Sequence, residues 1–160
     1  MSSSFTLHES YELGGAFTWR LKESEIRFRG SGIYANLVDR RIPAEFDQIV
    51  NFVDALNLID VWTWREDYHP HDVGFEVMDG STWSFVAAIE GNECKCGGFN
   101  AYPSFGAATQ TTLDRGRYAL LVAALYACFD IDTYIHIAKH QRQHDLEQTD
   151  NQGMHTESPS

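Results

Sequence analysis

The apolar residues of the first sixty positions follow two different periods, and this change constrains the fold more than any other feature. In segments 16–21 and 25–30, apolar side chains alternate with polar ones, as in strands that bury one face. From Pro43 to Ile59 they recur three and four residues apart, which predicts a helix with one apolar stripe and Pro43 in its first turn. The chain therefore has to pack a sheet against a helix.

The middle of the chain predicts further strands. A strand is expected at 60–67, where Trp62 and Trp64 would share a face. Asp79–Gly80 is a strong signal for a tight hairpin, here between segments 74–78 and 82–89. Short connections of this kind favour antiparallel pairing.

Two helical segments are expected after the strands. Asp114 can cap a helix that ends near Ala127. Segment 131–147 is compatible with either a strand or a helix, and its good helix formers favour the helix. We therefore expect a single α+β domain, residues 1–148, followed by a polar, disordered tail at 149–160. In this domain a mainly antiparallel sheet of about five to six strands packs two or three helices on one face.

The net charge of the chain limits which classes of molecule it can bind. Twenty-three acids and twelve bases give a net charge of −11. Such a chain repels nucleic acid and anionic lipid, so we expect neither as a partner. No apolar run approaches the roughly 18 residues of a membrane span, and the first ten residues do not resemble a signal peptide, so we expect a cytoplasmic protein. Three cysteines do not make a disulfide framework.

The segment CKCGGFNAYPSF, residues 94–105, combines several turn-forming residues. Gly97 and Gly98 predict a bulge or a sharp bend, and Asn100 can form an Asx turn. Tyr102 and Pro103 then predict an extended exit. The segment is either the lip of a functional site or the place where a strand leaves the sheet.

Part of the chain, roughly residues 55–105, resembles a pattern found in small bacterial proteins of uncharacterised function. The pattern is a tryptophan, then D-G-x2-W, then G-x-N-A-Y-P. The residues that carry it are Trp62, Trp64, Tyr68, Asp79, Gly80, Trp83, Gly98, Asn100, Ala101, Tyr102 and Pro103. The resemblance brings no catalytic residues. The chain is also similar to acidic immunity or anti-defence proteins, which neutralise a partner by binding it. This similarity implies a toxin or defence protein as the partner.

Aromatic residues with acidic neighbours form the candidate partner-binding surface. This composition is typical of an interface anchor with its rim, and an aromatic core is the alternative. The candidate residues are Trp62, Trp64, Tyr68, Asp72, Asn100 and Tyr102.

Two groups of histidines are candidate metal ligands. His69 and His71 lie beside Asp72, and an exposed turn is the alternative explanation for them. His136, His140 and His144 are four residues apart, so on a helix they would lie along one side. There the alternative is a solvated helix face.

Catalytic motifs are missing, because the chain has no G-x-S-x-G, no P-loop and no G-x-G-x-x-G. We therefore expect a non-enzymatic binding protein with no cofactor, acting through an acidic, aromatic surface on a protein partner. The alternatives are a metal-dependent enzyme or metal-binding module that uses the histidines, and a small-ligand-binding protein.

Overall fold

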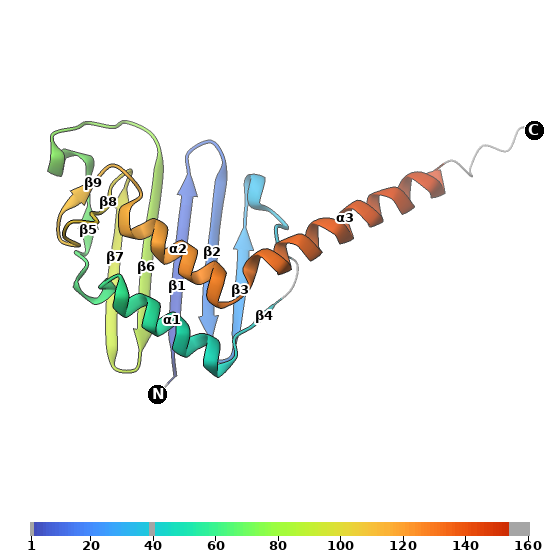
Figure 1. Ribbon diagram of the computed structural model, residues 1–160. Helices are drawn as coiled ribbons and strands as arrows, with labels where there is room; N and C mark the ends of the chain where they lie inside the picture. Colours follow the sequence, from blue (N-terminus) through green and yellow to red (C-terminus); the bar gives the residue numbers. More distant parts are fainter. Residues whose placement is uncertain (1, 39–40, 154–160) are drawn as a thin grey trace, which may run out of the picture.

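The computed structural model describes residues 2–38 and 41–153, and within them one seven-stranded sheet dominates (Figure 1). The strand order is β4-β3-β2-β1-β6-β7-β5. The strands are β1 Ser4–Tyr11, β2 Gly15–Lys22, β3 Glu25–Gly30, β4 Ile42–Pro43, β5 Asp67–Tyr68, β6 Ser81–Ile89 and β7 Asn92–Phe99, and β8 Tyr102–Pro103 pairs with β9 Thr111–Thr112 in a second, two-stranded sheet. The helices are α1 Phe46–Leu58, α2 Gly116–Cys128 and α3 Ile131–Gly153, with short 3-10 turns η1 Gly32–Tyr34, η2 Val61–Thr63 and η3 Pro70–Val73.

The expected α+β class is confirmed. Every pairing in the large sheet is antiparallel except that of β5 with β7. The strand count is somewhat higher than expected, because the two edge strands β4 and β5 have only two residues each. These edge strands cover only Glu25 and Ile26 of β3 and only Gly97 and Gly98 of β7, so within the described residues most of the outer edge of each of these two longer strands has no partner strand.

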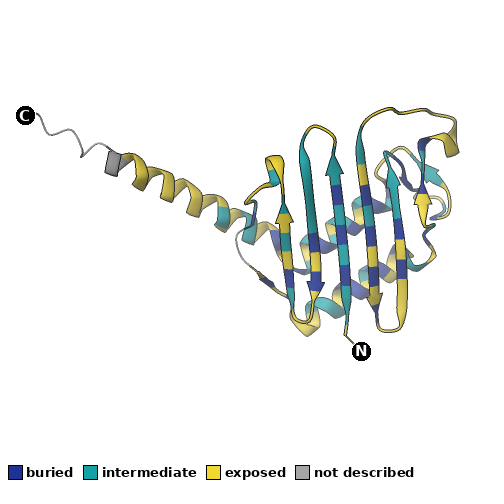
Figure 2. Cartoon of the chain, turned by 180° about the vertical axis from the view of Figure 1, so that it is seen from behind, coloured by how far each residue is buried: buried dark blue, intermediate teal, exposed yellow. Residues whose placement is uncertain are grey.

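One face of the sheet is covered by α1 and α2, and the other is open (Figures 1 and 2). The strands bury alternate residues, as the period of two requires. Phe5 of β1 contacts Phe52 of α1 and Phe129 after α2, with ring centroids 5.0 and 6.2 Å apart. The buried residues form one continuous core between the sheet and these two helices.

The hairpin expected at Asp79–Gly80 is wrong. Residues 74–80 form a loop between η3 and β6, and β6 instead pairs with β1 on one side and with β7 on the other. Both edges of β6 are therefore occupied, so segment 74–78 cannot form a hairpin with it. The strand expected at 60–67 is also wrong over most of its length, because η2 occupies Val61–Thr63.

The helix starts differ from expectation in detail. Glu45 is the N-cap of α1, and its side chain and that of Gln48 bond reciprocally to backbone N–H groups in a capping box. Pro43 lies in β4 rather than in the first turn. Helix α2 is preceded by Arg115, whose side chain makes no cap hydrogen bond, so Asp114 is not the N-cap.

Segment 131–147 is helical, as favoured, and α3 leaves the body of the molecule (Figure 1). It continues to Gly153, so the first residues of the expected tail are helical, and residues 154–160 lie outside the described part. Within the described residues no single helix is long and apolar enough to cross a membrane. Helices α2 and α3 reach that length and hydropathy only when they are taken together, and they are bent by 69° relative to each other.

Candidate functional site

A buried carboxylate joins the sheet to α2. Glu9 of β1 is only 1% exposed, and its oxygens accept hydrogen bonds from the hydroxyls of Tyr11 and Tyr118 and from the Arg115 guanidinium. The distances are 3.0 Å from Arg115 Nη1 to Oε1 and 2.7 Å from the Tyr118 hydroxyl to Oε2. A buried charge needs such partners, because an unpaired carboxylate in the core would be strongly destabilising.

The same environment keeps the two phenols neutral. Burial, and then the neighbouring Glu9 carboxylate, raise the pKa of Tyr118 far above its ordinary value. Burial, followed by the hydrogen bond to Glu9, also raises the pKa of Tyr11. Each of these groups is engaged within the network, so its evident role is to fix α2 on the sheet.

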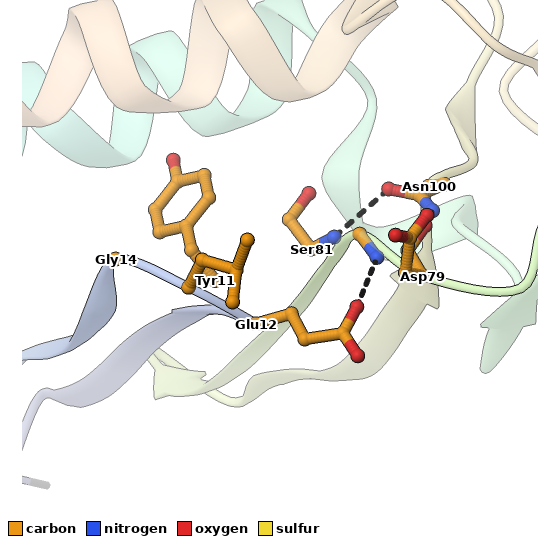
Figure 3. A pocket seen from close by; sticks show the side chains of 8 residues that line it. Tyr11, Glu12, Gly14, Asp79, Ser81 and Asn100 are labelled. Carbon is orange, nitrogen blue, oxygen red and sulfur yellow. Dashed lines mark hydrogen bonds between the residues drawn. The ribbon is translucent and has the colours of Figure 1, made fainter.

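Next to this network, two turns line a shallow, open pocket of ≈ 420 Å³ (Figure 3). One wall is the β1–β2 turn, with Glu12 and Gly14, and the other is the end of the loop that enters β6, with Asp79 and Gly80. The turns are bonded to each other, since the Gly80 N–H donates to Glu12 Oε2 at 3.2 Å and the Glu12 N–H donates to the Gly80 carbonyl at 3.3 Å. The pocket therefore has a backbone frame that joins two distant parts of the sequence.

The Asn100 side chain holds the backbone on one side of this pocket in place. Its Oδ1 accepts from the Ser81 N–H at 2.9 Å, and its Nδ2 donates to the Asp79 carbonyl at 2.8 Å. Its backbone has φ 47°, a conformation that asparagine tolerates better than most residues. A Cβ on Gly80 would lie 2.0 Å from Asn100 Nδ2, so only glycine lets this side chain approach.

Exposed apolar side chains lie on the two segments that form the pocket. Leu13 in the β1–β2 turn and Met78 beside Asp79 are each 99% exposed, and Phe75 in the same loop is 57% exposed. Figure 1 shows this turn and the loop at the same end of the sheet. Acidic side chains accompany them, and we call the set the loop rim: Glu12, Leu13, Phe75, Glu76, Met78 and Asp79. Exposed apolar tips within acidic surroundings are the composition of a docking surface.

The aromatic members of the expected partner surface lie elsewhere. Trp64, Tyr68 and Tyr102 are 7%, 0% and 6% exposed. Their rings gather around Trp83, with centroids 6.0 to 6.1 Å from it, and so belong to an aromatic core, the alternative that the sequence left open. Trp62 is half-buried, and its Nε1 donates to Asn57 Oδ1 at 2.7 Å.

Asp72 ties η3 to the second sheet. Its Oδ2 accepts from the Thr111 hydroxyl at 2.6 Å, from the His69 N–H at 3.2 Å and from Arg65 at 3.0 Å. These bonds, the one from Thr111 first, lower the pKa of the Asp72 carboxyl to about 2. Of the six expected site residues, only Asn100 lines the pocket.

The histidines form pairs. His69 lies over His71 with ring centroids 5.5 Å apart, and its Nε2 is 2.7 Å from Asp67 Oδ2. His136 and His140 on α3 have centroids 4.3 Å apart. In the part of the chain that the structure describes, no group of three or more His, Cys, Asp or Glu side chains is arranged to hold a metal ion.

Cys94 and Cys96 are free, buried thiols on one face of β7, with their Sγ atoms 3.4 Å apart. Their mutual hydrogen bond lowers the pKa of Cys94 and, together with burial, raises that of Cys96. Both side chains are buried in the core.

Comparison of this chain with protein-family models, with curated proteins and with solved structures finds no match. The function therefore has to be inferred from the geometry of the chain itself. Sequence analysis did not identify Glu9 as a buried residue, because a single acid within an alternating strand resembles any solvent-facing residue. The position of Glu9 in the pattern, in phase with Phe5 and Leu7, was the available signal.

Proposed function

We propose that this chain is a non-enzymatic binding protein that docks its loop rim on a basic protein partner, in the manner of a cytoplasmic immunity or anti-defence inhibitor. The observation that carries the proposal is the exposure of Leu13, which lines the pocket, and of Met78, which precedes the pocket residue Asp79; each is 99% exposed. Exposing apolar side chains of this size to water costs free energy. A partner that covers them would recover this free energy on binding.

The acidic residues of the rim supply orientation. Glu12, Glu76 and Asp79 are exposed, and the whole chain carries −11. Complementary charge accelerates the encounter with a basic partner more than it adds affinity, so we expect association to slow as salt rises. The apolar tips then determine how slowly the complex dissociates.

The test is capture of the partner by the immobilised chain, either from the native host or after co-expression with an adjacent toxin gene. The rim variant Leu13→Ser/Met78→Ser should lose capture about tenfold or more, the loss expected when interface anchors are removed. The matched control is Leu58→Ser/Leu146→Ser, which removes side chains that are 87% and 68% exposed on α1 and α3. Equal capture by both variants would refute the proposal, as would turnover of a small molecule by a chain that binds no protein.

A second candidate function rests on the pocket itself. Its ≈ 420 Å³ is within the range of small-molecule sites, about 300 to 1,000 Å³, and Ser81 and Asn100 supply polar groups. A small polar ligand retained there would be seen as an added mass by native mass spectrometry, and Gly80→Ala, which displaces Asn100, would abolish it. A rim variant that still carries the ligand but no longer captures protein would separate the two functions.

A further inference from the structure

The open face of the sheet carries a cluster of positive side chains, although the chain as a whole is strongly acidic. This cluster consists of Arg20 and Lys22 of β2 and Arg27 and Arg29 of β3, and we call it the cationic face. Four of the twelve basic residues of the chain thus lie on two adjacent strands, all of them exposed. The face is the one turned toward the viewer in Figure 2, away from α1 and α2.

The strand register sets the spacing of these charges. Arg20 is directly opposite Arg27, and Arg29 is opposite Thr18. Directly opposite residues are about 5 Å apart, and alternate residues of one strand about 7 Å apart. The cationic side chains therefore start from neighbouring positions on the two strands, in a regular grid with spacings of about 5 and 7 Å.

Among the described residues, few carboxylates neutralise this grid. Glu25 bonds Arg27 at 2.6 Å and also faces Arg41 at 3.5 Å, so one carboxylate serves two cations. Within residues 2–38 and 41–153, Arg20 and Arg29 make no hydrogen bond or ion pair through their side chains. Like charges directly opposite each other destabilise a sheet.

Protection of a sheet edge accounts for only part of the cluster. Arg27 and Arg29 lie on β3, which β4 covers only at Glu25 and Ile26, and charged side chains on such an edge hinder unwanted pairing. Arg20 lies on β2, which has β1 on one side and β3 on the other. An edge-protecting role does not explain an arginine on an interior strand.

We infer that the cationic face is a second binding site, separate from the loop rim, and that it takes a short acidic segment of a protein. Guanidinium groups bind carboxylates through paired hydrogen bonds, and the carboxylates of an extended acidic segment recur at the spacing of the arginines on β3. A nucleic acid fits less well, because it would extend beyond four cations into the negative field of the rest of the chain. Phe99 lies on the open face but on β7, three strands away from β2, so no tryptophan, tyrosine or phenylalanine of the described strands stands beside the four cations for bases to stack on.

The test is fluorescence anisotropy with a labelled peptide of about eight glutamates, long enough to cross the grid since an extended residue spans about 3.3 Å. Binding should be measurable at about 0.01 M ionic strength and should weaken strongly at about 0.15 M, where the screening length falls to about 8 Å. Arg20→Gln/Arg27→Gln should lower the affinity about tenfold or more, a difference easily resolved in such a titration. Lys139→Gln/Arg142→Gln on α3 makes the same change in net charge away from the face and should alter the affinity by less than about twofold.

The folded state provides a second readout. Arg20→Gln/Arg27→Gln removes both a repulsive pair and the exposed ion pair of Arg27 with Glu25, two small effects of opposite sign. The melting temperature should therefore change little, so a loss of peptide binding cannot be attributed to unfolding. An equal loss in the α3 control, or no binding at low salt, would overturn the site. A single-stranded oligonucleotide of the same charge that binds more tightly than the peptide would overturn the assignment of a protein segment.

Discussion

The aromatic core around Trp83 and the apolar tips of the loop rim lie close together in the sequence but differ completely in burial. Trp83 is 3% exposed and Met78 is 99% exposed. The difference follows from the backbone, since Trp83 belongs to β6, which is paired on both sides, whereas Met78 lies in a loop. Large apolar side chains with acidic neighbours in the sequence can therefore lie either in the core or on the surface. The pairing of the strand that carries them determines which of the two occurs.

The largest expected effect is on the core side of this comparison. Trp83→Ala should lower the free energy of unfolding by about 3–5 kcal/mol, the usual cost of removing a large buried aromatic side chain. Its ring contacts Tyr118 and three further aromatic residues, all of which would line the cavity. Urea unfolding measures this, with Met78→Ala as the exposed control that should change stability by less than about 0.5 kcal/mol. Equal effects would contradict the comparison.

A smaller effect is expected for Glu9→Gln, which removes the buried charge but keeps the shape. The loss should be about 1.5–3 kcal/mol, the range for hydrogen bonds to a charged group. Glu12→Gln in the loop rim is the exposed control. A loss as large for Glu12→Gln as for Glu9→Gln would show that burial is not what makes the Glu9 network important.

The same network predicts a pH dependence at the alkaline end. The pKa values of Tyr11 and Tyr118 are raised in the fold, so the folded state holds these protons more tightly than the unfolded state. Their contribution is complete below pH 10, near the pKa of an unfolded tyrosine, and is lost as the pH rises above it. Stability measured from about pH 8 to 11 should fall less steeply in Tyr118→Phe than in the wild type. Parallel curves would contradict this account.

Gly80→Ala tests the frame of the pocket. We expect a loss of about 1–2 kcal/mol beyond the cost of the backbone conformation, because the new Cβ displaces Asn100 from its bonds to Asp79 and Ser81. Gly91→Ala is the matched control, since Gly91 also has positive φ but an added Cβ meets nothing within 4 Å. If the two variants had the same free energy of unfolding, the proposed role of Asn100 would be refuted.

The smallest effect belongs to Asp72, whose pKa is lowered to about 2. A lowered pKa means that the carboxylate stabilises the fold above about pH 4 and loses this contribution as the pH falls toward 2. Because the residue is exposed, Asp72→Asn should cost less than about 1 kcal/mol at neutral pH and nothing near pH 2. Acid titration of both chains checks this, and a difference that persists at pH 2 would contradict it.

Sequence patterns predicted the fold class and most elements because period and turn chemistry are local. The strands at 16–21 and 25–30 and the helix over 46–58 follow from such signals. The loop at 74–80 could not be predicted, because its apolar residues alternate like a strand and only the pairing of β6 with β1 excludes them from the sheet. Asn100 was identified through turn chemistry, whereas the site around it joins residues 12–14 to 79–81, a long-range contact that no local pattern contains.

The central claim is that a partner docks on the loop rim and leaves the aromatic core untouched. Amide hydrogen exchange of the chain, with and without its captured partner, tests this most directly. We expect new protection at residues 12–14 and 75–80 and unchanged exchange at 62–68. Protection at 62–68 without protection at the rim would contradict the claim.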